Sequence, residues 1–167
     1  METRKASFMG SWYPGDVHQC KSAIQAFLKG PLCPAPKNHG TEWIAGIVPH
    51  AGWRFSGQLA CRTLHALSQG RPADLLIIFG MHLRSSDEPV IMVSGQWETP
   101  FGPLPVAEEI CHDLSTHFNC RIETARDFTP DNTIELQLPF IRHFWGDVSI
   151  VPMGVPPNDD AMAVGET

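Results

Sequence analysis

The stretch Asp74-Leu-Leu-Ile-Ile-Phe-Gly-Met-His82 decides the fold that this sequence predicts. Its five consecutive apolar residues stop at a glycine, and a short apolar run of this kind is typical of a strand buried in the sheet of an α/β protein, here over 74–79. The stretch Trp43-Ile-Ala-Gly-Ile-Val-Pro-His50 has a similar form and predicts another strand over 43–48. Each predicted strand is followed closely by a histidine.

These two histidines, His50 and His82, are predicted to share one crevice. Ligands of open α/β sheets bind outside the carboxyl ends of the strands, and both histidines follow such an end. Imidazole is the commonest protein ligand of metal ions and the commonest general base. The pair therefore indicates a metal site or acid–base chemistry, whereas a single histidine at a strand end is more often a hydrogen-bonded structural residue.

Helices and strands are predicted to alternate along the rest of the chain. Apolar spacing, caps and Gly or Pro stops predict helices over 16–29, 57–68 with Ser56 as cap, 105–117 and 132–144, and another after Pro156. Further strands are predicted over 89–93, 120–124 and 148–151, and irregular structure over 31–41 and 97–103. This alternation implies one α/β domain over residues 1–167, with a mainly parallel or mixed central sheet flanked by helices on both faces.

Composition argues against several classes of protein. Of the 167 residues, 43% are hydrophobic and 18% charged, which is enough apolar mass for a core. The net charge of −6 and the scattered Lys and Arg residues argue against a nucleic-acid partner. Nothing approaches the ~20 apolar residues of a membrane span, and the N-terminus lacks the apolar core of a signal peptide, so we expect a cytoplasmic protein without a membrane partner.

The five cysteines form no Cys-x-x-Cys pair and are expected to be reduced thiols. The oligomeric state stays open.

Five motifs follow one another along nearly the whole chain: Phe8-Met-Gly-Ser-Trp-Tyr-Pro14, Pro49-His-Ala-Gly-Trp-Arg-Phe-Ser-Gly57, Phe79-Gly-Met-His82, Trp97-Glu-Thr-Pro-Phe-Gly102 and Asp131-Asn-Thr-Ile-Glu-Leu-Gln-Leu-Pro-Phe140. Together, and in this order, they resemble the Memo-like family, the B component of the AmmeMemoRadiSam proteins. That family is related in fold to class III extradiol ring-cleaving dioxygenases. The resemblance implies a class III extradiol dioxygenase-like α/β fold with a metal-binding crevice, and we expect the C-terminal part of the family fold to be absent from the chain.

The resemblance implies that His50 and His82 are metal ligands, in agreement with the argument from the strand ends. In the dioxygenase relatives, two histidines and a carboxylate hold ferrous iron and leave positions open for substrate and oxygen. The cofactor expected here is a divalent ion, iron, copper or zinc. Candidates for supporting the ligands or binding a substrate are Trp53, Arg54, Arg84, Asp131, Asn132 and Glu135.

The chain departs from the family pattern at two positions, because Asn132 and Phe128 stand where the family usually has histidines. Asparagine is no general base, and phenylalanine is neither ligand nor acid. Asp131 is also predicted as a helix N-cap, and Glu135 faces either solvent or a histidine ligand. Two functions stay open: a metal-dependent oxidoreductase of dioxygenase type, and a non-catalytic binding or adaptor module that uses the same crevice for a peptide or small molecule.

Overall fold

Helices and strands alternate along most of the chain, as the sequence predicts. The structure is a computed structural model, and it describes residues 1–30, 43–70 and 72–166. Its elements, in chain order, are β1 (Thr3–Arg4), α1 (Val17–Lys29), α2 (Trp53–Ser68), β2 (Leu75–Gly80), β3 (Val90–Met92), β4 (Gln96–Trp97), β5 (Leu104–Pro105), α3 (Glu108–His117), β6 (Arg121–Glu123), α4 (Asn132–Glu135), α5 (Leu138–Trp145), β7 (Ser149–Gly154) and α6 (Asp159–Glu166). The irregular stretch predicted over 31–41 lies outside the described residues.

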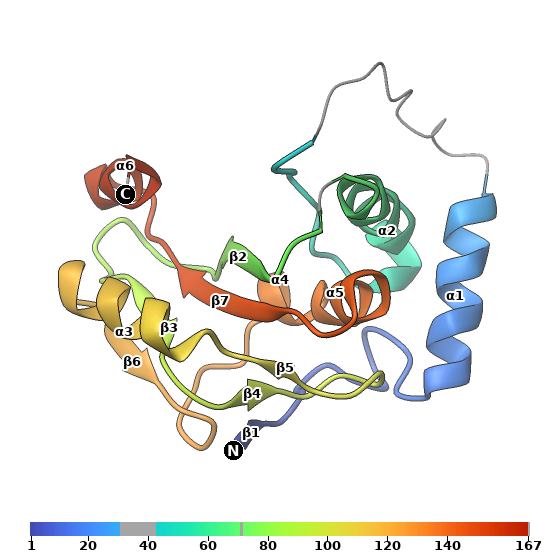
Figure 1. Cartoon of the computed structure of the whole chain (residues 1–167), viewed down its shortest axis with the longest axis horizontal. Helices are drawn as coiled ribbons and strands as arrows, with labels where there is room; N and C mark the ends of the chain where they lie inside the picture. The colour runs from blue at the N-terminus through green and yellow to red at the C-terminus, as the bar shows by residue number, and fades with distance from the viewer. Residues whose placement is uncertain (31–42, 71, 167) are drawn as a thin grey trace.

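The central sheet is mixed and has the strand order β2-β7-β3-β6 (Figure 1). β2 pairs with β7 in parallel over its full length, from Leu75 opposite Ser149 to Gly80 opposite Gly154. β3 pairs in parallel with β6 and antiparallel with β7. A smaller sheet, in the order β1-β4-β5, brings the N-terminus beside the middle of the chain.

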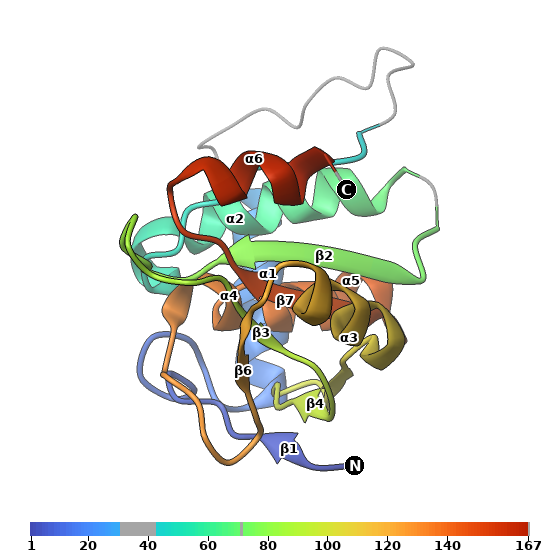
Figure 2. The same cartoon turned by 90° about the vertical axis from the view of Figure 1, so that its left-hand side faces the viewer.

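Helices lie on both sides of the central sheet, as predicted. α1, α2 and α5 gather on one side and α3 and α6 on the other, and the turned view in Figure 2 places α3 and α6 in front of the strands. Where α2 meets α5, the rings of Trp53 from α2 and Phe140 from α5 stack with their centroids 4.0 Å apart. No helix in the described residues combines the length and the apolar character that a membrane crossing requires.

Local signals set the ends of several helices. Asp16 caps α1, since its Oδ1 accepts hydrogen bonds from the backbone N–H groups of His18 and Gln19 at 2.9 and 3.0 Å. Glu108 and Glu109 place negative charge in the first turn of α3, where the helix dipole favours it. These features confirm the predicted helices at both places.

Three predicted elements differ in the structure. The segment 43–48 belongs to no strand, because no described strand pairs with it. α2 begins at Trp53 after Gly52, so Ser56 is not its cap, and the Ser56 hydroxyl instead donates a hydrogen bond to the Ala51 carbonyl. The helix predicted over 132–144 is two helices, α4 and α5, with Leu136 and Gln137 between them.

Candidate functional site

The imidazoles of His50 and His82, here called the imidazole pair, lie side by side near the carboxyl end of β2. Their ring centroids are 5.0 Å apart and their planes cross at 74°. His82 follows β2 after one intervening residue, and His50 precedes α2. Both side chains are exposed, and both line the same cleft. The structure therefore brings together the two residues that the sequence singles out as metal ligands.

Asn132, the first residue of α4, joins the two imidazoles. Its Nδ2 donates a hydrogen bond to the His50 carbonyl at 2.7 Å and lies 3.1 Å from His50 Nδ1. Its Oδ1 lies 3.1 Å from His82 Nε2. Because an amide nitrogen only donates and an amide oxygen only accepts, His50 Nδ1 presents its lone pair and His82 Nε2 its proton in this arrangement. One amide thus orients both rings.

The capped start of α4 holds Asn132 in place. Asp131 accepts hydrogen bonds from the backbone N–H groups of Thr133 and Ile134, at 2.9 and 3.3 Å, and so acts as the predicted N-cap. The Thr133 hydroxyl donates to the same carboxylate and accepts a hydrogen bond from Met81 N–H at 2.6 Å. Through this hydroxyl, the start of α4 is tied to the turn that carries His82.

The turn between β2 and His82 has an unusual backbone. Met81 has a φ of 71°, in the left-handed region that residues other than glycine seldom adopt. Gly80 lies so close to α4 that a Cβ there would come within 2.8 Å of Ile134 Cγ1 and closer still to Thr133 Oγ1. Such backbone strain is commonly found beside functional residues, and here it sets the direction of His82.

Gln137, which the sequence analysis did not select, fixes the segment before His50. Its Nε2 donates to the Pro49 carbonyl at 3.2 Å and to the Thr133 carbonyl at 3.3 Å. Its Oε1 is buried and has no hydrogen-bond partner among the described residues. The side chain lines the cleft. No pattern in the sequence marks it, because its partner at Pro49 lies 88 positions away.

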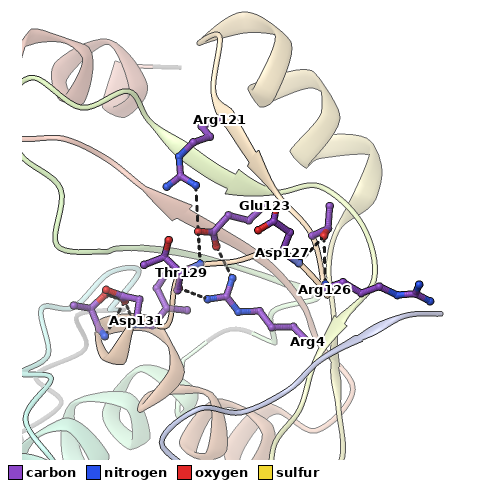
Figure 3. A network of polar contacts seen from close by, with 10 residues as sticks. Arg4, Arg121, Glu123, Arg126, Asp127, Thr129 and Asp131 are labelled. Atoms are coloured by element: carbon purple, nitrogen blue, oxygen red, sulfur yellow. Dashed lines mark hydrogen bonds and ion pairs between the residues drawn. The ribbon is translucent and has the colours of Figure 1, made fainter.

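A buried ion pair anchors the loop that leads into α4 (Figure 3). Arg4 and Glu123, each 1% exposed, are joined by a bond of 2.6 Å from Nη1 to Oε2. Arg4 Nη2 also donates to the Thr129 carbonyl at 3.0 Å, and Glu123 Oε1 accepts from Thr129 N–H at 2.9 Å. The Arg4 guanidinium lies over the rings of Trp97 and Phe128, 3.7 and 4.1 Å from their centroids. Phe128, one of the two departures from the family pattern, thus packs on this ion pair.

Glu135 holds the N-terminal loop. Its carboxylate accepts hydrogen bonds from Ser7 N–H at 2.9 Å, Phe8 N–H at 2.8 Å and the Tyr13 hydroxyl at 3.1 Å. Burial and the negative charge of Glu135 raise the pKa of Tyr13. Of the two alternatives left open for Glu135, the solvated face is excluded, because the residue is 2% exposed.

The remaining candidates are Trp53, Arg54 and Arg84, and the structure places them in different surroundings. Trp53 is buried in the core, where its Nε1 donates to the Leu136 carbonyl at 3.0 Å, so its ring serves packing. Arg54 and Arg84 are exposed. Arg84 N–H donates to Asp87 Oδ2 at 2.7 Å, which shapes the loop after His82. Both arginines stay candidates for contact with an anionic ligand.

A cleft of about 830 Å³ extends from the imidazole pair. Two of its walls are the segment 43–48 and the strand β2, each of which leads toward one of the two histidines, and residues of α2, α4 and α5 complete the lining. Within residues 1–30, 43–70 and 72–166, no group of three or more His, Cys, Asp or Glu side chains is placed to hold a metal ion. The imidazole pair and Asn132 are therefore the donors that this end of the cleft offers.

The described cysteines lie away from this chemistry. Burial raises the pKa of the Cys61 and Cys111 thiols to about 12 and that of Cys20 to about 11. The thiolate is the reactive form, so we expect iodoacetamide at about pH 8 to spare these three thiols in the folded protein and to label them after unfolding in urea. Peptide mass spectrometry gives the readout, and labelling of Cys61 in the folded protein contradicts the prediction. Cys33 lies outside the described residues.

Comparison with known proteins relates the whole chain to one family. A family model described as Memo-like protein matches residues 4–167. A MEMO1 family protein of Pyrobaculum aerophilum is 32% identical over 157 residues, which cover 92% of this chain and 56% of the relative. Another, of Pyrobaculum arsenaticum, is 32% identical over 159 residues, covering 93% and 57%. A third, of Metallosphaera sedula, is 30% identical over 156 residues, covering 90% and 55%.

The chain thus spans little more than half the length of these relatives. The region that the family model matches includes the motifs around His50, His82 and Asn132, since it extends from residue 4 to residue 167. The resemblance seen in the sequence motifs is confirmed: the chain belongs to the Memo-like family.

Proposed function

We propose that this protein binds a divalent metal ion, iron, copper or zinc, between His50 and His82, and that the ion holds a small ligand at the mouth of the cleft. One observation carries the proposal: a nitrogen of each ring lies 3.1 Å from the same Asn132 amide. Two imidazole nitrogens thus face one small volume. Imidazole nitrogen suits each of these three metals.

The residues present fit such an ion as a partial ligand set. His50 Nδ1 supplies one nitrogen donor, and His82 Nε2 supplies the second when the His82 ring takes the tautomer with its proton on Nδ1. Asn132 Oδ1 supplies an oxygen once its contact with His82 is released. Three protein donors with a free position are typical of catalytic or exchangeable sites rather than closed structural ones. Both imidazoles are exposed, so an ion and its ligand have access from solvent.

A bound ion of this kind would supply Lewis-acid polarisation to a ligand in its open positions. The protein's own residues position the donors: Gln137 fixes the segment before His50, and Thr133 fixes the turn before His82. Asn132 neither takes up nor releases a proton near neutral pH, so it does not replace the family's histidine as a base. The proposal is therefore that the protein binds a metal ion and a ligand. Dioxygenase-type oxidoreduction would be an extension of this function, and the two imidazoles alone would then have to transfer protons.

The cleft itself favours a second candidate function, a non-catalytic binding module for a peptide or small molecule. The cleft is large, about 830 Å³, and apolar side chains form most of its lining. Ligand sites are commonly apolar clefts with a few polar groups, and here His50, His82 and Gln137 are those groups. Ligand binding that persists in excess EDTA would favour this function over the metal-dependent one.

Calorimetric titration with Zn²⁺, Cu²⁺ and, under anaerobic conditions, Fe²⁺ tests the metal proposal. We expect one ion for each chain, and we expect His50→Ala and His82→Ala each to weaken binding at least about tenfold, since each removes one of few donors. His18→Ala, which removes an exposed imidazole on α1, is the matched control and should bind as the unaltered protein does. The absence of stoichiometric binding, or equal binding by all variants, would overturn the proposal.

A further inference from the structure

The strand β2 is an unprotected edge of the central sheet. In the described residues it pairs with β7 alone, and the views in Figures 1 and 2 show it as the outermost strand. It contains no charged residue, and its Ile77 and Phe79 are 54% and 56% exposed. Natural proteins usually protect such edges with charges, prolines or bulges, because an open edge pairs with other chains.

The opposite edge of the same sheet follows that rule. β6 is short and carries the exposed Arg121 beside Ile122, which is 51% exposed. A charged edge of this kind disfavours pairing with another strand. The two edges therefore differ in chemistry, and only β2 has the composition of a strand that pairs on both sides.

The segment 43–48 lies across the cleft from β2 and is equally apolar. Its Ile44 and Ile47 are 93% and 97% exposed. At Gly46 the segment lies against α2, since a Cβ there would be 3.0 Å from both Leu67 Cδ1 and Thr63 Cγ2. α2 thus supports this segment from one side, while its isoleucines have no cover among the described residues.

The cleft between these two walls has room for a short extended segment. A six-residue strand about 20 Å long, with about 4.8 Å to each neighbouring strand and about 10 Å between packed layers, takes up about 950 Å³. The cleft measures about 830 Å³. A strand placed here would have β2 on one side and 43–48 on the other, and the sequence pattern of 43–48 is itself that of a strand.

Gln137 adds a polar feature that suits a polypeptide. Its Oε1 is buried at the lining of the cleft and lacks a hydrogen-bond partner among the described residues. An acceptor left unpaired in this way destabilises the folded protein, and a donor in the cleft would relieve that cost. Backbone N–H groups are donors that every strand carries.

We propose that this cleft receives an extended apolar strand from the part of a Memo-like protein that lies outside the matched region, and that this strand pairs with β2. The relatives supply the reason for that occupant, since the chain matches only 55–57% of their length. The rest of the relatives' length offers chain for such a strand. The inference does not depend on metal binding: the imidazole pair lines the same cleft, but strand pairing uses the backbone of β2 and needs no nitrogen of either ring.

The test uses the unmatched part of the Pyrobaculum aerophilum relative, produced as a separate polypeptide. As a positive control, this polypeptide must first reassociate with the matched region of the same relative, which shows that it is able to bind. Mixed with the 167-residue protein, it should form a 1:1 complex in light scattering. Hydrogen exchange of the β2 amides should slow at least about tenfold in the complex, as expected for newly paired strand groups.

Two charge substitutions locate the contact. Ile77→Lys on β2 should weaken the complex at least about tenfold, because an isoleucine that the added strand would bury is replaced by a cation. Ile122→Lys on β6 introduces the same charge at the opposite edge, at a residue of similar exposure, and should leave the affinity unchanged. Absence of a complex overturns the proposal. So does equal weakening by both variants, or a homodimer whose β2 amides are already protected without the added polypeptide.

Discussion

Replacement of Arg4 by methionine is expected to lower the free energy of unfolding by about 3–5 kcal/mol, because it removes the close, buried partner of the Glu123 carboxylate and leaves it the longer contact of 3.6 Å with the partly exposed Arg121. The ion pair is 1% exposed on both sides, so water cannot take the place of the guanidinium. The same change removes the hydrogen bond to the Thr129 carbonyl and the contacts with Trp97 and Phe128. Urea unfolding followed by tryptophan fluorescence measures the effect.

The neighbouring residue provides the matched control. Lys5 also makes an ion pair, with Glu98 at 2.9 Å, but the lysine side chain is 74% exposed. Lys5→Met should therefore change the stability by no more than about 1 kcal/mol. The double variant Arg4→Met with Glu123→Leu should regain much of the loss, since it removes the stranded charge. Equal effects of the Arg4 and Lys5 substitutions would refute this account of the ion pair.

Replacement of Asn132 by histidine is expected to strengthen metal binding about 100-fold. The amide of Asn132 contacts both imidazoles, so a ring at this position would face the same volume as the other two. The free energy of zinc binding to zinc-finger peptides is about 10–16 kcal/mol for four ligands. Each ligand thus contributes about 3 kcal/mol on average, or about 100-fold in affinity. Competition titration against a chromophoric zinc chelator measures the change.

Asn132→Ala serves as the control for this substitution. It removes the amide that orients the rings without adding a donor, so its affinity for zinc should not exceed that of the unaltered protein. Addition of His82→Ala to the histidine variant should return the affinity to about the original level, since both proteins then have two imidazoles. A histidine variant that binds no more tightly than the alanine variant would show that the three positions do not converge.

The sequence predicts best those elements that local patterns define. α1, α3 and β2 lie within a few residues of their predicted places, because caps and apolar spacing are read within one segment. The segment 43–48 is the instructive failure. Its pattern is that of a strand, but a strand also requires a partner, and no described strand pairs with it.

In the candidate site too, some features follow from local sequence patterns and others do not. The proximity of His50 and His82 follows from a general rule about strand ends, although the segment before His50 is not a strand here. The role of Asn132 follows from its contact with His50, which lies 82 positions earlier in the chain. The role of Arg4 follows from its contact with Glu123, which lies 119 positions later. Such contacts depend on how the whole chain folds, and spacing within a motif does not specify them. Glu135 illustrates the point, because its partners lie in the N-terminal loop.

The hydroxyl of Thr133 has a consequence for how substitutions in this protein should be interpreted. It connects Met81, in its left-handed backbone, to the beginning of α4. The backbone that leads into His82 is therefore held by a residue some fifty positions later in the chain. Altered metal affinity after a change in the 124–131 loop would report a redirected imidazole, even where no altered atom touches the ion.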